Sequence, residues 1–296
     1  MLDELKLLST WPPTYAFVTL LGLLWGSFAN VCIYRWPPSE EFPHGRSVVK
    51  PGSHCFECKT PIKWYDNVPL VSWLWLRGKC RSCQATFSGR YLIVEALTGA
   101  LFFVAWYMTV VLGAQFEAFD ITLVRFAIYA AFCFVMIVIT FIDIDHKLIL
   151  NKVTIPAIVV FYALGVVLPE RTWYDGLIGF AVGYGVPWLI GEIYFRLRGR
   201  EGLGLGDAML LGLVGALLGW KGVLVSLFGG SIVGTVITVI GLVVARGKRT
   251  ADAEAEEAGE GVLKQELPFG PFLAIAAVFW LFAEPWVQLQ FHLPSG

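Results

Sequence analysis

Two acidic clusters lie at the ends of apolar segments, where a carboxylate is costly to bury. Residues 202–207 (Gly-Leu-Gly-Leu-Gly-Asp) end in Asp207 and are followed at once by apolar residues. The second cluster, residues 143–146 (Asp-Ile-Asp-His), follows another apolar run. An ionisable residue at the edge of a membrane segment is by default a candidate functional group. If both clusters reach the same side of a membrane, Asp143 and Asp207 could share a proton and hydrolyse a peptide by general acid and base catalysis.

The glycine-rich run also fits a simpler interpretation. Glycine at every second position lets another backbone, or a substrate, approach closely. The same run could be a loop in which a solvated Asp207 caps the N-terminus of a helix. Residues 202–207 do not decide between these interpretations by themselves.

Within the other cluster we select Asp143 rather than Asp145 as the candidate catalytic group. Asp143 directly follows the apolar residues 138–142, whereas Asp145 is followed by His146 and Lys147. Asp143 is therefore expected to lie deeper and to be less hydrated. On a helix the two side chains point about 200° apart, so only one of them can face Asp207.

The composition is that of an integral membrane protein. Hydrophobic residues make up 57% of the chain, charged residues only 15%, and the mean hydropathy is +0.68. These values exceed the usual apolar share of a soluble domain. A formal net charge of −1 gives no indication of a nucleic-acid partner. The N-terminus has no basic region and no small-residue cleavage site before its first apolar run, so we expect that run to be retained.

About 20 mainly apolar residues are needed for a membrane-spanning helix. The chain contains eight candidate segments: residues 15–34, 91–113, 121–142, 153–168, 173–195, 207–219, 223–245 and 269–291. The weakest are 153–168, which is short and contains Pro156, and 207–219, which is also short. We therefore predict an all-α polytopic membrane protein with about eight transmembrane helices and no internal repeat.

We predict three parts in the chain. Residues 1–34 contain the first transmembrane helix, residues 35–90 form a polar loop with four cysteines, and residues 91–296 form a membrane core of about seven helices. Residues 251–261, with five acids among Ala and Gly, are expected to be a flexible part of the last cytoplasmic loop.

The distribution of basic residues predicts the orientation. If the loop 35–90 is cytoplasmic, all 22 Lys and Arg residues lie on the cytoplasmic side except Lys6, Arg125, Arg171 and Lys221. The positive-inside rule then places both termini outside. In this topology Asp143 and Asp207 both fall at cytoplasmic ends of membrane segments.

The polar loop carries two Cys-x-x-Cys pairs, Cys55/Cys58 and Cys80/Cys83. Four thiolates at such spacings suit tetrahedral Zn²⁺, although the gap between the pairs slightly exceeds the usual range. The loop has too few core residues to fold unaided. A redox dithiol, or four reduced cysteines, is the alternative. His54 borders the first pair, but four cysteines already complete a ligand set.

Two other polar insertions have more than one interpretation. Residues 26–30 (Gly-Ser-Phe-Ala-Asn), late in the first helix, could allow close helix packing, and Asn30 could cap a neighbouring segment. Glu95, about one turn into the next helix, could pair with Arg90 or face a polar cavity. Its spacing does not choose between the two.

Taken together, these motifs resemble those of the type IV prepilin peptidases, and the resemblance covers nearly the whole chain. It rests on residues 26–37, 53–58, 64–69, 76–83, 90–95, 141–146, 202–207 and 268–272. Each motif is modest alone, but their order, spacing and membrane placement together are highly specific.

The resemblance implies an aspartic peptidase of the GxGD type in the bacterial inner membrane, with its active site facing the cytoplasm. Such enzymes cut the leader from type IV prepilins or pseudopilins and then methylate the new N-terminal amine with S-adenosylmethionine. The family's acids correspond to Asp143 and Asp207, and its zinc ligands to Cys55, Cys58, Cys80 and Cys83. The methyltransferase site is expected near the cysteine loop. One departure is Leu150-Asn151, where the family commonly has Pro-Asp.

Two alternatives stay open at this point. One is a peptidase that lacks methyl transfer. The other is a membrane transporter that uses the two acids as a proton or cation relay, although transporters often show paired halves with interrupted helices at the midplane.

Overall fold

The computed structural model describes residues 10–113, 116–199, 204–249 and 268–291, and all regular elements in these ranges are helical. Gly202, Leu203, Lys6, Arg200, Lys264 and the acidic segment 251–261, all of which entered the sequence predictions, lie outside them. The chain divides into two compact units, Met1–Ile142 and Asp143–Gly296.

The first unit contains three long helical segments. Helix α2 (Pro12–Arg35) packs against α4 (Arg90–Trp106), which continues as the π-helical segment η2 (Tyr107–Leu112), and α5 (Phe119–His146) begins in this unit. The two helices approach closely because Gly22 has no side chain: a Cβ atom there would lie 2.9 Å from the Cα of Gly99. Their core includes Val18, Phe102 and Trp106.

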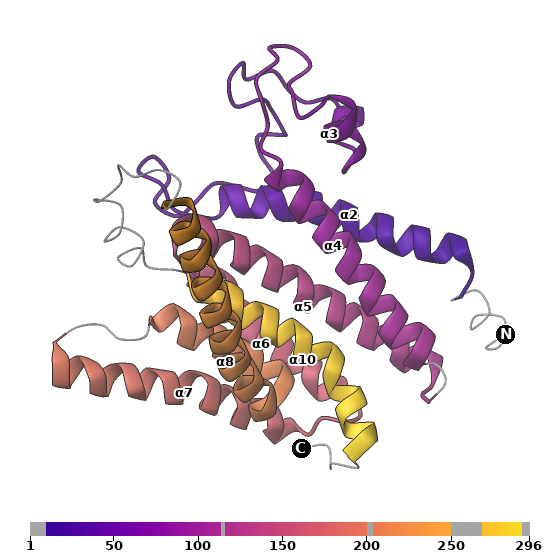
Figure 1. Cartoon of the computed structure of the whole chain (residues 1–296). Coiled ribbons are helices and arrows are strands. Elements are labelled where there is room, and N and C mark those ends of the chain that lie inside the picture. The colour runs from indigo at the N-terminus through magenta and orange to yellow at the C-terminus, as the bar shows by residue number, and fades with distance from the viewer. Residues whose placement is uncertain (1–9, 114–115, 200–203, 250–267, 292–296) are drawn as a thin grey trace. The chain divides into compact units, whose positions relative to one another are not determined.

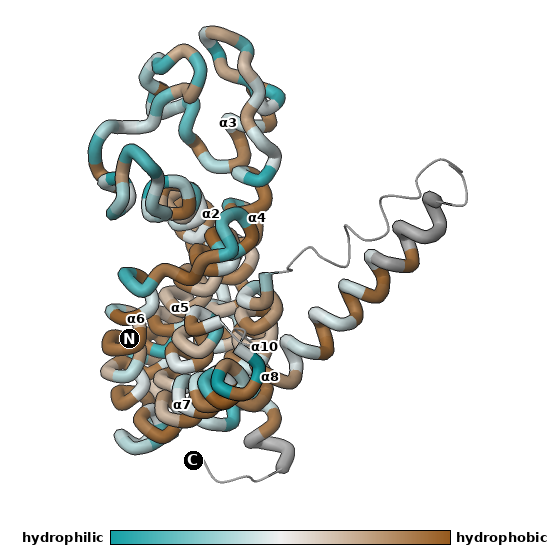
Figure 2. Tube along the Cα trace, turned by 90° about the vertical axis from the view of Figure 1, so that its left-hand side faces the viewer, coloured by the Kyte–Doolittle hydropathy of each residue, from teal (hydrophilic) through white to brown (hydrophobic). Residues whose placement is uncertain are grey.

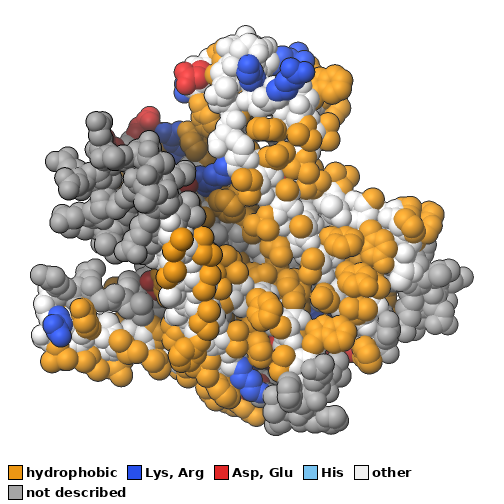
Figure 3. All heavy atoms as spheres, in the orientation of Figure 1, with side chains coloured by type: hydrophobic (Ala, Val, Ile, Leu, Met, Phe, Trp, Pro, Cys, Tyr) orange, Lys and Arg blue, Asp and Glu red, His pale blue; other side chains and the backbone are white. Residues whose placement is uncertain are grey.

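The polar loop between α2 and α4 carries only short helices, η1 (Trp64–Asn67) and α3 (Val71–Trp75). Figure 1 shows that this loop stands beyond the adjoining ends of α2 and α4. Hydrophilic residues recur along it, whereas hydrophobic residues dominate α2 and α4 (Figure 2). Lys and Arg side chains gather on the loop, and hydrophobic side chains cover the outside of the two helices (Figure 3).

The second unit is built around α8 (Leu205–Arg249), which packs against α6 (Asn151–Val167), α7 (Trp173–Arg198) and α10 (Gly270–Phe291). Glycines on α7 allow backbones to touch, as in many membrane bundles. A Cβ atom on Gly179 would lie only 2.1 Å from the carbonyl oxygen of Gly215, and one on Gly183 only 2.2 Å from that of Leu211.

Helix α8 is interrupted at Gly219, whose φ of 67° and ψ of −175° are not helical. The break leaves the carbonyl oxygen of Leu218 available, and Arg171 Nη1 donates a hydrogen bond to it over 3.1 Å. The same guanidinium pairs with Glu284 of α10. The carbonyl group freed by the break is thus paired with a largely buried side chain, as a buried backbone polar group requires.

The all-α membrane architecture is confirmed, but the count of eight spans is not. Among the described residues, six helices are long and apolar enough to cross a membrane. The two segments expected at 207–219 and 223–245 both lie in α8, which consists of two helices joined across a kink at Gly219, so the predicted boundary coincides with the break. Helix α6 has 17 residues, with Pro156 inside, and falls short of the required length.

Candidate active site and metal centre

Asp143 lies near the C-terminal end of α5, and only 5% of the residue is exposed. Its Oδ2 accepts a hydrogen bond of 3.1 Å from the backbone N–H of Gly270, the first residue of α10. This N–H is one of those that helix geometry leaves without an internal acceptor. A Cβ atom on Gly270 would lie 2.6 Å from Oδ2, so only glycine permits this approach.

Asp207 lies in the first turn of α8, where it is partly buried. Its backbone N–H donates a hydrogen bond of 3.1 Å to the carbonyl oxygen of Gly204, which precedes the helix. A Cβ atom on Gly204 would lie 3.5 Å from Asp207 Oδ2, so the carboxyl group turns back toward the glycine-rich segment. Asp207 is therefore the third residue of the helix and partly buried, so it is not the solvated N-cap that one interpretation of the glycine-rich run proposed.

Ile149 lies close to two glycines, one next to each of the two acids. A Cβ atom on Gly206, next to Asp207, would lie 3.0 Å from Ile149 Cβ, and one on Gly270 would lie 3.4 Å from Ile149 Cδ1. The two carboxyl groups are close enough to interact electrostatically. The structure thus brings Asp143 and Asp207 to one site in the second unit.

Asp145 differs from Asp143 in its environment. It is exposed, whereas Asp143 is buried, although both lie on the last turns of α5. The chain then leaves the helix through Lys147, which has a φ of 50° and donates its N–H to the carbonyl oxygen of Asp143. This turn carries the chain to Asn151, where α6 begins, so Leu150-Asn151 lies at a helix start.

The four loop cysteines form one cluster, with their Sγ atoms within 4.8 Å of one another. Sγ of Cys55 lies 3.7 Å from that of Cys83, and Sγ of Cys58 lies 4.0 Å from that of Cys80. Tetrahedral zinc with bonds of about 2.3 Å requires sulfur separations of about 3.8 Å. The cluster therefore fits a four-thiolate metal site, and His54 does not belong to it.

The two cysteine pairs are presented by equivalent turns. Cys55 N–H donates to the carbonyl oxygen of Thr60, and Cys80 N–H donates to that of Ala85. Lys59 and Gln84 take positive φ values of 56° and 61° at corresponding positions. Isolated antiparallel bridges, His54 with Pro61 and Lys79 with Thr86, close the two turns.

At two of the four cysteines, local hydrogen bonds favour the thiolate form that metals bind. The Thr60 hydroxyl, 3.2 Å from Sγ of Cys58, and the Thr60 backbone lower the pKa of the Cys58 thiol to about 6. Backbone N–H groups of Cys83 and Ser82 lower the pKa of the Cys80 thiol. The pKa of the Cys83 thiol is instead raised to about 11, because the hydrogen bond with the Ala85 backbone, which lowers it, is outweighed by burial and by hydrogen bonds with the other three cysteines. Metal binding requires deprotonated thiols, so the turns favour it at Cys58 and Cys80.

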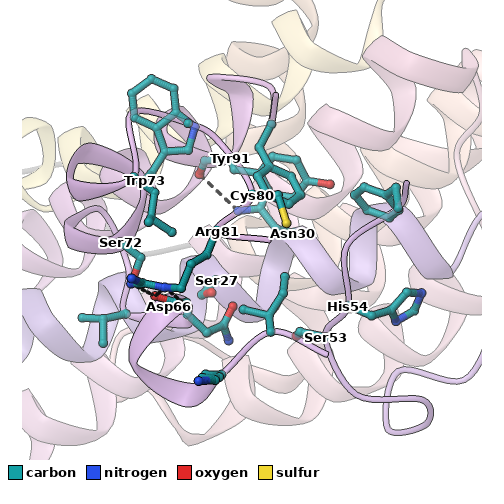
Figure 4. A pocket seen from close by; sticks show the side chains of 18 of the residues that line it. Ser27, Asn30, Ser53, His54, Asp66, Ser72, Trp73, Cys80, Arg81 and Tyr91 are labelled. Carbon is teal, nitrogen blue, oxygen red and sulfur yellow. Dashed lines mark hydrogen bonds and ion pairs between the residues drawn. The ribbon is translucent and has the colours of Figure 1, made fainter. Parts of the chain in front are cut away.

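A cavity of about 220 Å³ lies in the first unit between the cysteine loop and the adjoining ends of α2 and α4. Figure 4 labels Ser27 and Asn30 of α2 together with His54 and Arg81 of the loop among the side chains that line it. Asn30 Nδ2 donates to the carbonyl oxygen of Tyr91 over 3.1 Å, so it ties α2 to the start of α4.

The structure decides between the two interpretations of Glu95. It lines the cavity, is 8% exposed, and accepts a hydrogen bond of 2.8 Å from the backbone N–H of Leu70. Arg90 instead donates to the carbonyl oxygen of Phe141. Residues 26–30 serve packing as well, because a Cβ atom on Gly26 would lie 2.7 Å from the Cα of Glu95.

Sequence reasoning did not identify the partners of these groups. Gly270, which holds Asp143, lies 127 residues away along the chain. Leu70, which holds Glu95, has no polar side chain that could indicate a role. Asp66, which receives hydrogen bonds from Arg81 across the loop, was noted only as part of a motif.

Comparison with known proteins covers both units. A family model described as the bacterial peptidase A24 N-terminal domain matches residues 20–109, and one described as the type IV leader peptidase family matches residues 130–239. No solved structure gave a significant match.

Curated relatives carry a common name, prepilin leader peptidase/N-methyltransferase. The protein from Aeromonas salmonicida is 34% identical over 292 residues, which cover 90% of both chains. The protein from Neisseria gonorrhoeae is 35% identical over 84% of this chain and 89% of its own. The protein from Myxococcus xanthus is 35% identical over 84% of this chain and 70% of its own.

Proposed function

The chain belongs to the type IV leader peptidase family, and on this basis we propose that it removes the leader of type IV prepilins or pseudopilins and methylates the new N-terminus. The observation that carries the peptidase half is the meeting of Asp143 and Asp207 around Ile149. The methyltransferase half is supported by the relatives' names. Those relatives are enzymes, so we do not retain the transporter alternative.

Asp143 and Asp207 are the proposed catalytic pair. Two close carboxyl groups in a poorly hydrated site share one proton, because both cannot ionise cheaply. The ionised member takes a proton from a water molecule as that water attacks the scissile carbonyl carbon. The protonated member donates its proton to the carbonyl oxygen. Collapse of the tetrahedral intermediate breaks the C–N bond, and a proton returns to the leaving amine.

The N–H of Gly270 has a defined part in this scheme. It holds Oδ2 of Asp143 in place, so the other carboxyl oxygen is left to face the water and Asp207. A carboxylate fixed in this way loses little freedom when the reaction begins. Gly270 is therefore a positioning residue in the proposed mechanism.

The metal of the cysteine loop is proposed to be zinc with a structural role. Cys55, Cys58, Cys80 and Cys83 would fill all four tetrahedral positions, which leaves none for a catalytic water. The bound ion would hold the two equivalent turns together, because the loop 35–90 has too few core residues to do so by itself. S-adenosylmethionine is the proposed methyl donor.

The orientation follows the basic residues. We place the loop 35–90 and the acid pair on the cytoplasmic side of a bacterial inner membrane. In this proposal the loop 35–90 and the acid pair of the core 91–296 are exposed to the same aqueous compartment. A reporter fused after Lys248 is expected to be cytoplasmic and one after Lys221 periplasmic, and a periplasmic signal at Lys248 would overturn this placement.

One assay tests the proposed function. Purified protein in lipid nanodiscs is incubated with a prepilin and with S-adenosylmethionine labelled in its methyl group. We expect release of the leader, followed by incorporation of label at the new N-terminus. Cleavage without incorporation of label would mean that the protein is a peptidase that lacks methyl transfer. Absence of cleavage would refute the proposal.

A further inference from the structure

Among the residues that the structure describes, two acidic side chains line the cavity of the first unit, and they differ in their partners. Asp66 receives three hydrogen bonds from the Arg81 guanidinium, with distances from 2.5 to 3.1 Å, so its charge is already balanced. The ion pair is drawn in Figure 4. Among the described residues, no basic side chain forms an ion pair with Glu95.

The groups that do contact Glu95 are neutral. The backbone N–H of Leu70 donates to Oε2 over 2.8 Å, and the uncharged Ser27 lines the same cavity. Leu70 has a φ of 58°, a conformation that costs a non-glycine residue energy. The loop thus adopts an unfavourable backbone conformation at the point where it presents an N–H to this carboxylate.

A carboxylate that is 8% exposed and lacks a cation is costly to keep ionised. A cationic ligand in the cavity would offset that cost. Glu95 lies five residues after the start of α4, which corresponds to about 8 Å along the helix axis. It therefore lies near the end of the membrane segment that bears the polar loop. The new N-terminus of a substrate whose apolar helix lies in the bilayer would reach this depth.

We propose that Glu95 binds the α-amine of the processed pilin at the floor of this cavity, which would make the cavity the site of methyl transfer. This inference rests on the proposed methyltransferase function. The carboxylate pairs with the ammonium form of the amine and accepts one proton from it. The neutral nitrogen then forms a bond to the methyl carbon of S-adenosylmethionine, while the C–S bond breaks and its electron pair stays on sulfur. The products are a secondary ammonium group and a neutral thioether.

The loop residues that line the cavity suit the methyl donor. Lys63 and Lys79 line it from the loop, and either ammonium group could pair with the donor's carboxylate. The side chains of Trp73 and Phe87 offer aromatic surface for an adenine ring. This distribution leaves Glu95, on the helix side, for the acceptor.

The test compares Glu95→Gln with the unmodified protein in nanodiscs, with an already processed pilin as methyl acceptor. Glutamine keeps the acceptor oxygen for Leu70 but removes the charge. We expect kcat/KM for the processed pilin to fall at least about 100-fold, within the range for loss of a general base. The KM for S-adenosylmethionine should change little. The residual rate should rise with pH toward the α-amine pKa of about 8, because solvent then supplies the neutral amine.

Three controls separate a chemical role from a structural one. Glu95→Asp should restore part of the rate, and Glu40→Gln, which alters an exposed loop acid, should have no effect. Prepilin cleavage and metal content should be unchanged in Glu95→Gln. Unaltered methylation, a rise confined to the KM for the donor, or equal losses of cleavage and methylation would each overturn the assignment of Glu95. Absence of methylation by the unmodified protein would refute the methyltransferase function itself.

Discussion

The cysteine loop and the acid site solve the same problem, the placement of charged groups beside a membrane, by opposite means. In the loop, two equivalent turns position the four thiols, and the backbone hydrogen bonds that form each turn join residues four, five and nine positions apart. At the acid site, the residues come from three separate parts of the second unit: Asp143 and Ile149 from the end of α5 and the connection after it, Asp207 from the start of α8, and Gly270 from the start of α10. Local turns combined with a metal can tolerate movement of the helices, whereas the acid pair depends directly on their packing.

This difference predicts how each region fails. The acid site should be sensitive to changes of a single atom, because the shared proton requires both carboxyl groups and their spacing. The loop should fail as a unit, because loss of the metal removes the interaction that holds both turns. The following four predictions test that contrast, beginning with the largest effect.

Asp143→Asn and Asp207→Asn should each reduce the rate of prepilin cleavage by about 10²- to 10⁴-fold or more, since asparagine can neither accept nor donate the proton. The measurement is the initial rate of leader release by each purified variant. The protein should remain folded, because asparagine preserves the shape of the side chain. Cleavage at the unmodified rate in either variant would remove that residue from the proposed pair.

Gly270→Ala should reduce kcat for cleavage by about 10²-fold, because the added methyl group would lie 2.6 Å from Asp143 Oδ2 and displace the carboxyl group. The matched control is Gly185→Ala, on α7, where a Cβ atom would meet nothing within 4 Å. Steady-state kinetics of both variants should show a loss only in the first. Equal activity of the two would mean that the N–H of Gly270 does not position the acid.

Replacement of Cys58 and Cys83 by Ser should remove about one zinc ion per chain and unfold the loop, because binding of a structural metal is coupled to folding. Elemental analysis and limited proteolysis of the loop measure these effects. Methyl transfer should be lost, while cleavage should survive in part. Cys133, buried in α5, is the control: Cys133→Ala should retain the metal. Native, reduced protein without any metal would contradict the prediction.

Asp145→Asn should have the smallest effect and retain most of the cleavage activity. The residue is exposed and lies two positions from Asp143, so it tests whether burial selects the catalytic acid. Its kcat should stay within a few-fold of the unmodified enzyme, consistent with an exposed charge contributing little. Loss of cleavage here, with full activity in Asp143→Asn, would reverse the assignment of the two acids.

The features that the sequence predicted correctly are those encoded locally. Spacing alone indicated that Cys55, Cys58, Cys80 and Cys83 belong together, and their sulfur atoms do form one cluster. Hydropathy located the long helices within a few residues. The predicted boundary between the segments 207–219 and 223–245 coincides with the non-helical Gly219, where α8 is divided into two helices by a kink.

The features that the sequence could not predict depend on tertiary contacts. The hydrogen bond from Gly270 to Asp143 joins residues 127 positions apart, and no periodicity encodes it. The spacing of Arg90 and Glu95 along the helix was equally compatible with an ion pair between them. Only the return of the loop through Leu70 shows that the carboxylate faces a cavity.

The central claim is that cleavage and methyl transfer use different residues, the acid pair in the second unit and the cavity in the first. The most direct test is the rate at which Asp207→Asn protein methylates a pilin whose leader has already been removed. The account predicts the unmodified rate of label incorporation, together with no cleavage of intact prepilin by the same preparation. Loss of methylation in parallel with cleavage would contradict it, because one site would then serve both reactions.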